Sequence, residues 1–147
     1  QVYDKPANPF VAGFIGAMNF IADARKIDTG VYDIGETRLH VNAENGTGRL
    51  PAGSRVTIAI RPEDVMLRHD PSASNLLETR VAAMEYRGSL FRIDLKRRSS
   101  VENDAIITAD VPSETVRRLG ITLNSTLPVH LPVDRLRVYE MKIPVTN

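Results

Sequence analysis

The sequence contains no cysteine and no tryptophan, and only 5% of its residues are aromatic. Without cysteine, a disulfide framework and a thiolate zinc site are both excluded. With so few aromatic residues, a hydrophobic core must be built mainly from Val, Ile, Leu and Met. At 147 residues, 42% of them hydrophobic and 25% charged, the chain still has the composition of a globular protein.

Long apolar runs and an excess of one charge are also missing. The most apolar stretch, residues 9–21, is interrupted by Gly13, Gly16 and Asn19. No stretch reaches the roughly 20 apolar residues that a membrane helix needs. The formal net charge is +1, so the chain creates no large field that would attract nucleic acid or an anionic membrane.

Motifs that carry catalysis are absent as well. A Gly-rich loop ending in Lys-Ser/Thr would hold nucleotide phosphates, but the nearest approach, residues 46–48, is not followed by Lys. Neither a G-x-S-x-G nucleophile elbow nor a G-x-G-x-x-G dinucleotide loop occurs. His40, His69 and His130 lack the spacing of metal ligands. We therefore expect no enzyme activity, cofactor or metal in this chain.

The hydrophobic pattern predicts many short strands. Apolar and polar residues alternate with a period of two over residues 38–43 and 56–60, which is typical of half-buried strands. Short strands separated by Gly- and Asn-containing turns favour a small barrel or sandwich. We expect strands at residues 19–27, 30–34, 37–43, 54–61, 64–69, 76–87, 89–96, 104–111, 126–131 and 136–141.

Two short helices are expected beside the strands. One covers residues 113–119, with Pro112 ahead of it, Ser113 as its cap and Gly120 behind it. The other begins at residues 8–9, an Asn-Pro pair that favours a helix start, and ends at Gly16. Because two turns of helix are not stable alone, this helix must pack against something. Its apolar face is formed by Phe10, Val11, Phe14 and Ile15.

The sequence also indicates an internal repeat. Residues 53–67 and residues 127–139 share one order of features: an apolar strand, a proline, an acidic turn and a second apolar strand. The pattern therefore predicts two related halves.

Three phrases carry a resemblance to a known family. Residues 61–63 read R-P-E and are followed by Asp64, and Val81, Glu85 and Gly88 match a V-x-x-x-E-x-x-G stretch. A longer phrase, P-x-N-x-F-V-A-x-F-I-G-x-x-N, is represented by Pro6, Asn8, Phe10, Val11, Ala12, Phe14, Ile15, Gly16 and Asn19. Together they resemble the C-terminal regulatory domain of ABC importer ATP-binding subunits of the maltose, polyamine and ferric-iron type.

The resemblance implies an all-β fold, in which tandem TOBE segments form small OB-like barrels. Residues 1–18 would be a linker and short helix from a missing nucleotide-binding domain, and residues 19–147 the tandem regulatory domain. ATP and Mg²⁺ would belong to that missing domain. The implied function is a regulatory and dimerisation tail, cytoplasmic and peripheral to the inner face of the membrane.

The partners implied are the chain's own nucleotide-binding domain, a second ATPase subunit in a homodimer and, indirectly, the membrane permease subunits. The F-I-G-x-x-N phrase and the E-Y-R-G stretch at residues 85–88 favour a polyamine-type importer. Phe10, Phe14 and Ile15 are the candidates for interdomain or dimer contact.

Arg61, Pro62, Glu63 and Asp64 form the candidate regulatory motif. Pro62 breaks a β-ladder, and Arg61 offers a planar donor fork to the neighbouring carboxylates. Two interpretations follow from the residues: an Arg–carboxylate clamp that holds a corner, or a regulatory or subunit contact surface.

The sequence leaves two alternative functions to consider. A freestanding OB-like module would bind single-stranded nucleic acid through a basic cluster at residues 92–98, with Phe91 and Tyr86 stacking on bases. The net charge and the alternation of this cluster with Ile93 and Asp94 argue against it, so we expect no nucleic-acid partner. The other alternative is a sensor of a small ligand or oxyanion.

Overall fold

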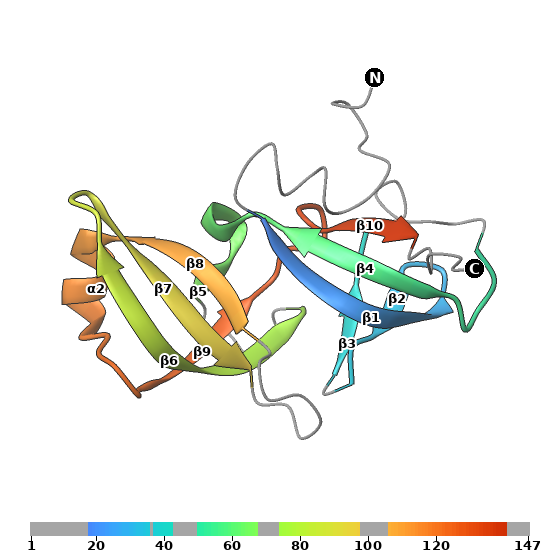
Figure 1. Ribbon diagram of the computed structural model, residues 1–147, viewed down its shortest axis with the longest axis horizontal. Helices are drawn as coiled ribbons and strands as arrows, with labels where there is room; N and C mark the ends of the chain where they lie inside the picture. The colour runs from blue at the N-terminus through green and yellow to red at the C-terminus, as the bar shows by residue number, and fades with distance from the viewer. Residues whose placement is uncertain (1–17, 36, 43–49, 68–73, 98–105, 141–147) are drawn as a thin grey trace, which may run out of the picture.

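The computed structural model describes residues 18–35, 37–42, 50–67, 74–97 and 106–140. These residues form two lobes, each built on one five-stranded antiparallel sheet (Figure 1). The sheet of the first lobe has the order β10 (Arg137–Glu140), β4 (Arg55–Ile60), β1 (Asn19–Asp28), β2 (Val31–Asp33) and β3 (Arg38–His40). The sheet of the second lobe has the order β5 (Met66–Leu67), β9 (Thr126–His130), β6 (Leu76–Tyr86), β7 (Leu90–Arg97) and β8 (Ile106–Pro112).

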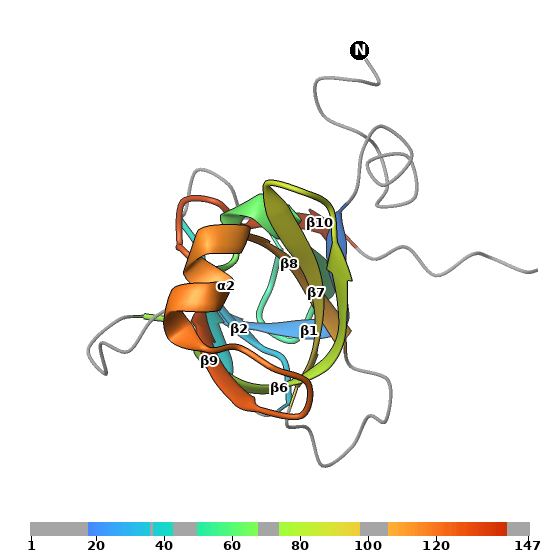
Figure 2. The same cartoon turned by 90° about the vertical axis from the view of Figure 1, so that its left-hand side faces the viewer.

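The two lobes exchange their edge strands. After β4 the chain turns through η2 (Pro62–Asp64) and continues as β5, which pairs with β9 of the second lobe. After β9 it turns again and returns as β10, which pairs with β4 of the first lobe. Figure 2 looks along the long axis from the second lobe and shows the strands curling around a common interior, with helix α2 (Ser113–Leu119) in front. Neither lobe is therefore complete without a strand from the other half of the chain.

The predicted internal repeat is confirmed by this topology and by matching backbone hydrogen bonds. Gly53, with a φ of 92°, precedes β4 and donates its N–H to the carbonyl of Lys26 at 2.7 Å. Asn124, with a φ of 68°, precedes β9 and donates its N–H to the carbonyl of Val81 at 2.8 Å. The turns after the two strands also match, because Asp64 N–H bonds to a carbonyl three residues earlier and Arg135 N–H does the same.

One hydrophobic core runs through both lobes. It contains the side chains of Ile58 on β4, Ile93 on β7 and Leu131 just after β9, which have no exposed surface. Tyr32 is also almost completely buried, at 1% exposure. Full burial of such side chains contributes about 1.5–3 kcal/mol each to folding. The core thus uses the aliphatic residues that the composition predicts.

Most predicted elements are confirmed, with two corrections. The helix at residues 113–119 is present and ends at Gly120 in the left-handed conformation, but Ser113 does not cap it. Pro112 occupies the N-cap position, and the Ser113 hydroxyl instead donates to the carbonyl of Gly88 at 2.6 Å. The strand expected at 64–69 is limited to β5 in the described residues, because residues 62–64 form the 3-10 turn η2.

Other expectations lie beyond what the structure describes. The predicted N-terminal helix, with Phe10, Phe14 and Ile15, falls outside the described residues. The proposed boundary between residues 1–18 and 19–147 stays a prediction. No helix in the described ranges is long and apolar enough to cross a membrane.

Candidate regulatory surface at the junction of the lobes

The predicted motif at residues 61–64 forms the first of the two connections between the lobes. Arg61 is extended, with φ −77° and ψ 148°, and Pro62 then starts the short 3-10 turn. The Pro62 ring is buried, and η2 packs against β8 of the second lobe. The N–H groups of Asp64 and Val65 close the turn by bonding to the carbonyls of Arg61 and Pro62, at 2.9 and 3.4 Å. The buried proline therefore fixes the path by which the chain passes from one lobe to the other.

The charged side chains of this connection, residues 61–64, which we call the corner, face outward. Arg61 and Glu63 are exposed, and Asp64 is half-buried. Ion pairs elsewhere in the described part of the chain include Arg55 with Asp23, Arg87 with Glu85 and Arg92 with Asp110. Both interpretations of the motif, a clamp at the corner and a contact surface, stay predictions.

A row of charges on the second lobe lies within electrostatic reach of the corner. Arg92 on β7 donates two hydrogen bonds to the Asp110 carboxylate on β8, from Nε and from one terminal nitrogen, each at 2.8 Å. Glu85 on β6 is the cross-strand neighbour of Arg92 on its other side. The hydrogen bonding of Arg92 to the Asp110 carboxylate is the largest cause that raises the pKa of Arg92, followed by the negative charges of Asp110, Glu85 and Glu63; burial opposes them. Arg92 is thus held mainly by Asp110, and the charge of Glu63 at the corner is the last of these contributions.

One member of the basic cluster considered for nucleic acid, Arg92, is paired with a carboxylate. The positive charge of Arg92 is matched by Asp110, and Asp94 accepts a hydrogen bond from the Thr108 hydroxyl at 3.0 Å. The rings of Tyr86 and Phe91 pack against each other, with centroids 5.2 Å apart. Arg98 lies outside the described residues. Acidic and basic groups therefore alternate on this face, which is the pattern of a solvated charged sheet.

Two buried asparagines join the lobes. Asn19, at the start of β1, donates from Nδ2 to the carbonyl of Thr108 and accepts from its N–H, both at 2.8 Å. Asn75, which precedes β6, makes the corresponding pair of bonds with the backbone of His40, at 2.8 and 2.7 Å, and donates also to the carbonyl of Leu131 at 2.8 Å. Each side-chain amide satisfies backbone groups at an edge strand of the opposite lobe.

The sequence analysis missed this role of the two asparagines. Asn19 was recognised as the last residue of the longer family phrase, without a structural function. Asn75 carried no signal, because nothing local shows that it will face a strand from the other half of the chain. The one usable clue is a polar residue at the beginning of a predicted core strand.

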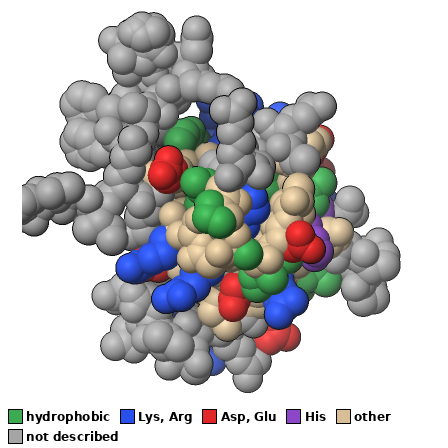
Figure 3. All heavy atoms as spheres, turned by 90° about the vertical axis from the view of Figure 1, so that its right-hand side faces the viewer, with side chains coloured by type: hydrophobic (Ala, Val, Ile, Leu, Met, Phe, Trp, Pro, Cys, Tyr) green, Lys and Arg blue, Asp and Glu red, His purple; other side chains and the backbone are tan. Residues whose placement is uncertain are grey.

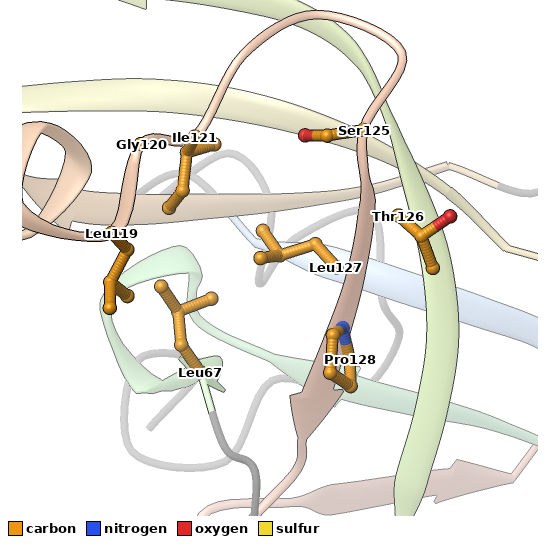
Figure 4. Close-up of a pocket in the computed structure, with 8 residues that line it drawn as sticks. All are labelled: Leu67, Leu119, Gly120, Ile121, Ser125, Thr126, Leu127 and Pro128. Atoms are coloured by element: carbon orange, nitrogen blue, oxygen red, sulfur yellow. The ribbon is translucent and has the colours of Figure 1, made fainter.

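A shallow apolar hollow lies at one end of the second lobe (Figure 4). Its volume is about 170 Å³, and no charged side chain lines it. The Ser125 hydroxyl is already engaged, since it donates to the carbonyl of Thr122 at 2.6 Å. The lining residues are Leu67, Leu119, Gly120, Ile121, Ser125, Thr126, Leu127 and Pro128. This lining suits an apolar group and offers no cation to an oxyanion.

The opposite end of the molecule has a mixed surface. Figure 3 faces the first lobe and shows acidic, basic and hydrophobic side chains interspersed where side chains are coloured. No group of three or more His, Cys, Asp or Glu side chains suited to a metal ion occurs among the described residues. The described part of the chain thus presents a candidate contact surface at the corner, where Arg61 and Glu63 are exposed.

Comparison with solved structures supports the fold class. The chain is similar to ModG, a cytoplasmic molybdate-binding protein crystallised with molybdate, with a TM-score of 0.65 and 18% sequence identity. The alignment covers 84% of this chain and 96% of that one. The protein is therefore a two-lobed, OB-like all-β domain.

Sequence comparison identifies the family. The profile of the TOBE domain matches residues 58–138, a span that begins in β4 and ends in β10 and includes both connections between the lobes. The chain belongs to the TOBE domain family.

The import ATP-binding proteins that this chain matches in sequence include several that are longer than it. An Fe(3+) ions import ATP-binding protein of Rhizobium meliloti is 33% identical over 95% of this chain and 36% of its own length. A trehalose/maltose import ATP-binding protein of Thermococcus litoralis is 34% identical over 72% of this chain and 35% of its own. A spermidine/putrescine import ATP-binding protein of Pseudomonas fluorescens is 30% identical over 86% and 33%. The chain thus spans about a third of the length of these relatives.

Proposed function

We propose that this chain is the regulatory tail of the ATP-binding subunit of an ABC-type solute importer. The observation that carries the proposal is the match of the TOBE profile to the strand-exchanged part of the fold, together with relatives that are import ATP-binding proteins. ATP and Mg²⁺ belong to the nucleotide-binding domain of the parent subunit. The role of the tail is mechanical, and it acts through the surfaces by which it contacts other domains and subunits.

The tail holds two ATP-binding subunits together and transmits a regulatory signal between its own surface and the nucleotide-binding domain. The exposed Arg61 and Glu63 are the proposed contact residues on the described part of the chain. The corner suits this role because its backbone is fixed by the buried Pro62 while its charges face solvent. The lobes are joined by both connections and by both asparagines, so we expect a contact at the corner to affect both lobes.

The transported solute is a separate question. The names of the relatives include iron, sulfate or thiosulfate, trehalose or maltose, and spermidine or putrescine. The polyamine assignment stays a prediction that rests on two short sequence phrases. Uptake of radiolabelled putrescine, sulfate and maltose by cells with and without the parent gene distinguishes these substrates.

The dimer contact is tested on the parent subunit in the absence of ATP, so that nucleotide does not hold the subunits together. Light scattering after size-exclusion chromatography should give a dimer for the intact subunit and a monomer after deletion of residues 19–147. A dimer that survives the deletion would contradict the proposed dimerisation role.

The alternative binding functions make different predictions. A nucleic-acid module would be retained on single-stranded DNA at low salt and released as the salt rises. An oxyanion sensor would be stabilised against thermal unfolding by molybdate or sulfate. We expect neither effect, because Arg92 of the basic cluster is paired with Asp110, the net charge of the chain is only +1, and the hollow of the second lobe is apolar.

A further inference from the structure

Two exposed leucines border the apolar hollow at the end of the second lobe. Leu119 ends α2, lines the hollow and is 40% exposed. Leu123 is 57% exposed and lies in the turn between Ile121 and Ser125, which both line the hollow. Figure 2 faces this end of the lobe, where α2 lies in front of the strands. Large apolar side chains that gather at an exposed hollow mark a contact surface.

The hollow opens directly onto the hydrophobic core. Ile121 and Leu127 form its buried part and belong to the core, whereas Leu67 is only half-buried. Figure 4 shows that the side chains of Leu67, Leu119, Ile121 and Leu127 point toward one shared space. A cavity of about 150 Å³ holds one benzene ring, so the volume of about 170 Å³ here has room for one apolar side chain. Such a side chain would extend the core outward.

The turn that carries Leu123 does not need a leucine in order to form. The N–H of Ser125 bonds to the carbonyl of Thr122, and in the first half of the repeat the N–H of Ser54 bonds to the carbonyl of Pro51, both at 3.2 Å. Ala52 therefore occupies the position of Leu123 in the same backbone turn. Folding alone does not account for a leucine that is mostly exposed here, whereas contact with a partner would.

Positive charge prevails around the hollow. Arg117 and Arg118 lie in the last turn of α2 and are exposed, and neither forms an ion pair with a carboxylate of the described residues. On the other side of the hollow, the exposed Arg80 of β6 is the cross-strand neighbour of a lining residue of β9. The carboxylates nearby are Glu114, in the first turn of α2, and Glu78 on β6. The three arginines outnumber them, which complements an acidic partner.

We propose that this hollow is the docking site for an acidic protein segment that inserts one apolar side chain. The inserted side chain packs between Leu119 and Leu127, and Leu123 covers it from the rim. Carboxylates that flank it bind Arg117 and Arg118. The proposal does not depend on the importer role or on the corner at residues 61–64, because it rests on the chemistry of this surface alone.

Synthetic peptides added to the isotope-labelled chain test this proposal by NMR. The probes are two acetylated peptides, D-E-L-E-L-D-E and D-E-L-E-E-E-L-E-D, whose leucines share one face of a strand and of a helix respectively. Two control sets replace every carboxylate residue with Lys or every Leu with Ser. At least one acidic probe should shift the amides of residues 117–128 and bind at least about tenfold more tightly than both of its controls. Added salt should weaken this binding.

Matched variants separate the apolar contribution from the charged one. Leu119→Ala and Leu123→Ala should each weaken probe binding by about fivefold or more. Ile106→Ala removes a side chain that is also 40% exposed, at the far end of β8 from α2, and should have no more than about a twofold effect. Replacing Arg117 and Arg118 together with Gln should weaken binding by about fivefold. The same change at the exposed Arg25 and Arg38 of the first lobe is the charge-matched control.

Four results would overturn the proposal. The first is the absence of a saturable shift with either acidic probe at about 1 mM. The second is equal binding of the lysine or serine controls. The third is a set of shifts confined to the first lobe. The fourth is a shift of residues 117–128 that depends on protein concentration without any peptide, since a second copy of the chain would then occupy the hollow.

Discussion

The side chain of Asn19 holds the backbone of Thr108 with two hydrogen bonds of 2.8 Å, one donated and one accepted, across 89 residues of sequence. Asn75 holds the backbone of His40 in the same manner in the opposite direction. The first strand of each half thus reaches the last hairpin strand of the other half. The two lobes are joined at both ends by asparagines as well as by their exchanged strands.

Replacing Asn19 with Ala should therefore destabilise the whole domain. The substitution leaves the N–H and carbonyl of Thr108 without their partner, which costs about 2 kcal/mol in the free energy of unfolding. Urea unfolding followed by circular dichroism measures this loss. Lys96→Ala, on the exposed surface of β7, is the control and should stay within about 0.5 kcal/mol of the unmodified chain. A cost no larger than that of the control would contradict the role of Asn19.

The pair formed by Arg92 and Asp110 should contribute more than a fully exposed ion pair. Its two side chains are 26% and 12% exposed and are joined by two hydrogen bonds, so a double-mutant cycle with Arg92→Met and Asp110→Asn should give a coupling of about 1 kcal/mol. The pair Arg87–Glu85, 44% and 64% exposed, is the comparison and should give less than about 0.5 kcal/mol. Equal couplings would contradict the expectation that partial burial and two hydrogen bonds strengthen the Arg92–Asp110 pair.

The raised pKa of Arg92 has a defined consequence for pH dependence. Because its folded pKa lies above its ordinary value, its stabilisation is complete below the ordinary pKa of an arginine and is lost only as the pH rises through the folded pKa. Between about pH 6 and 9, titration of Arg92 therefore adds no slope to the stability of the domain. Urea midpoints of the unmodified chain and of Arg92→Met should differ by a constant amount over this range. A difference that changes with pH would contradict this assignment.

Gly30 and Gly88 provide a matched test of backbone crowding. Both lie in hairpin turns with positive φ, 73° and 80°, so Ala at either position is strained by about 1 kcal/mol. A Cβ on Gly30 would also lie 2.8 Å from the carbonyl oxygen of Val41, whereas a Cβ on Gly88 has open space. Gly30→Ala should therefore lower the unfolding free energy by about 1–3 kcal/mol more than Gly88→Ala. Equal losses would show that the loop at Val41 moves away without cost.

The corner charges should matter for function and not for folding. Arg61 and Glu63 are exposed, so Arg61→Ala and Glu63→Ala should each change the unfolding free energy by no more than about 0.5 kcal/mol. In the parent subunit, the same substitutions should weaken dimerisation in the absence of ATP, measured by analytical ultracentrifugation. The control is Lys96→Ala. If neither corner variant changed dimerisation, the dimer contact would not involve Arg61 or Glu63, and another surface would have to form it.

The strands and the second helix were predictable because their signals are local. Alternation over residues 56–60 and the Pro112 to Gly120 boundary both reflect neighbouring residues, and the structure has elements there. The cap of that helix was mispredicted because the Ser113 hydroxyl donates a hydrogen bond to the carbonyl of Gly88 in the neighbouring hairpin. That contact depends on tertiary packing, which a cap preference does not include.

The candidate site was only partly predictable. The motif at residues 61–64 was identified through its family resemblance and its proline, and it does connect two strands. The pairing of β4 with β10 and the bonds of Asn75 join segments far apart in sequence, so no local pattern indicates them. The involvement of Arg92 and Asp110 likewise follows from the register of β7 with β8.

The size of the native polypeptide tests the central claim most directly. An antibody raised against this domain should detect, on an immunoblot of source cells, a band far above 16.3 kDa, about three times this length by comparison with the relatives. Such a band, co-purifying with ATPase activity, is what the importer-tail account predicts. A single band at 16.3 kDa would contradict it and would make a freestanding binding module the better account.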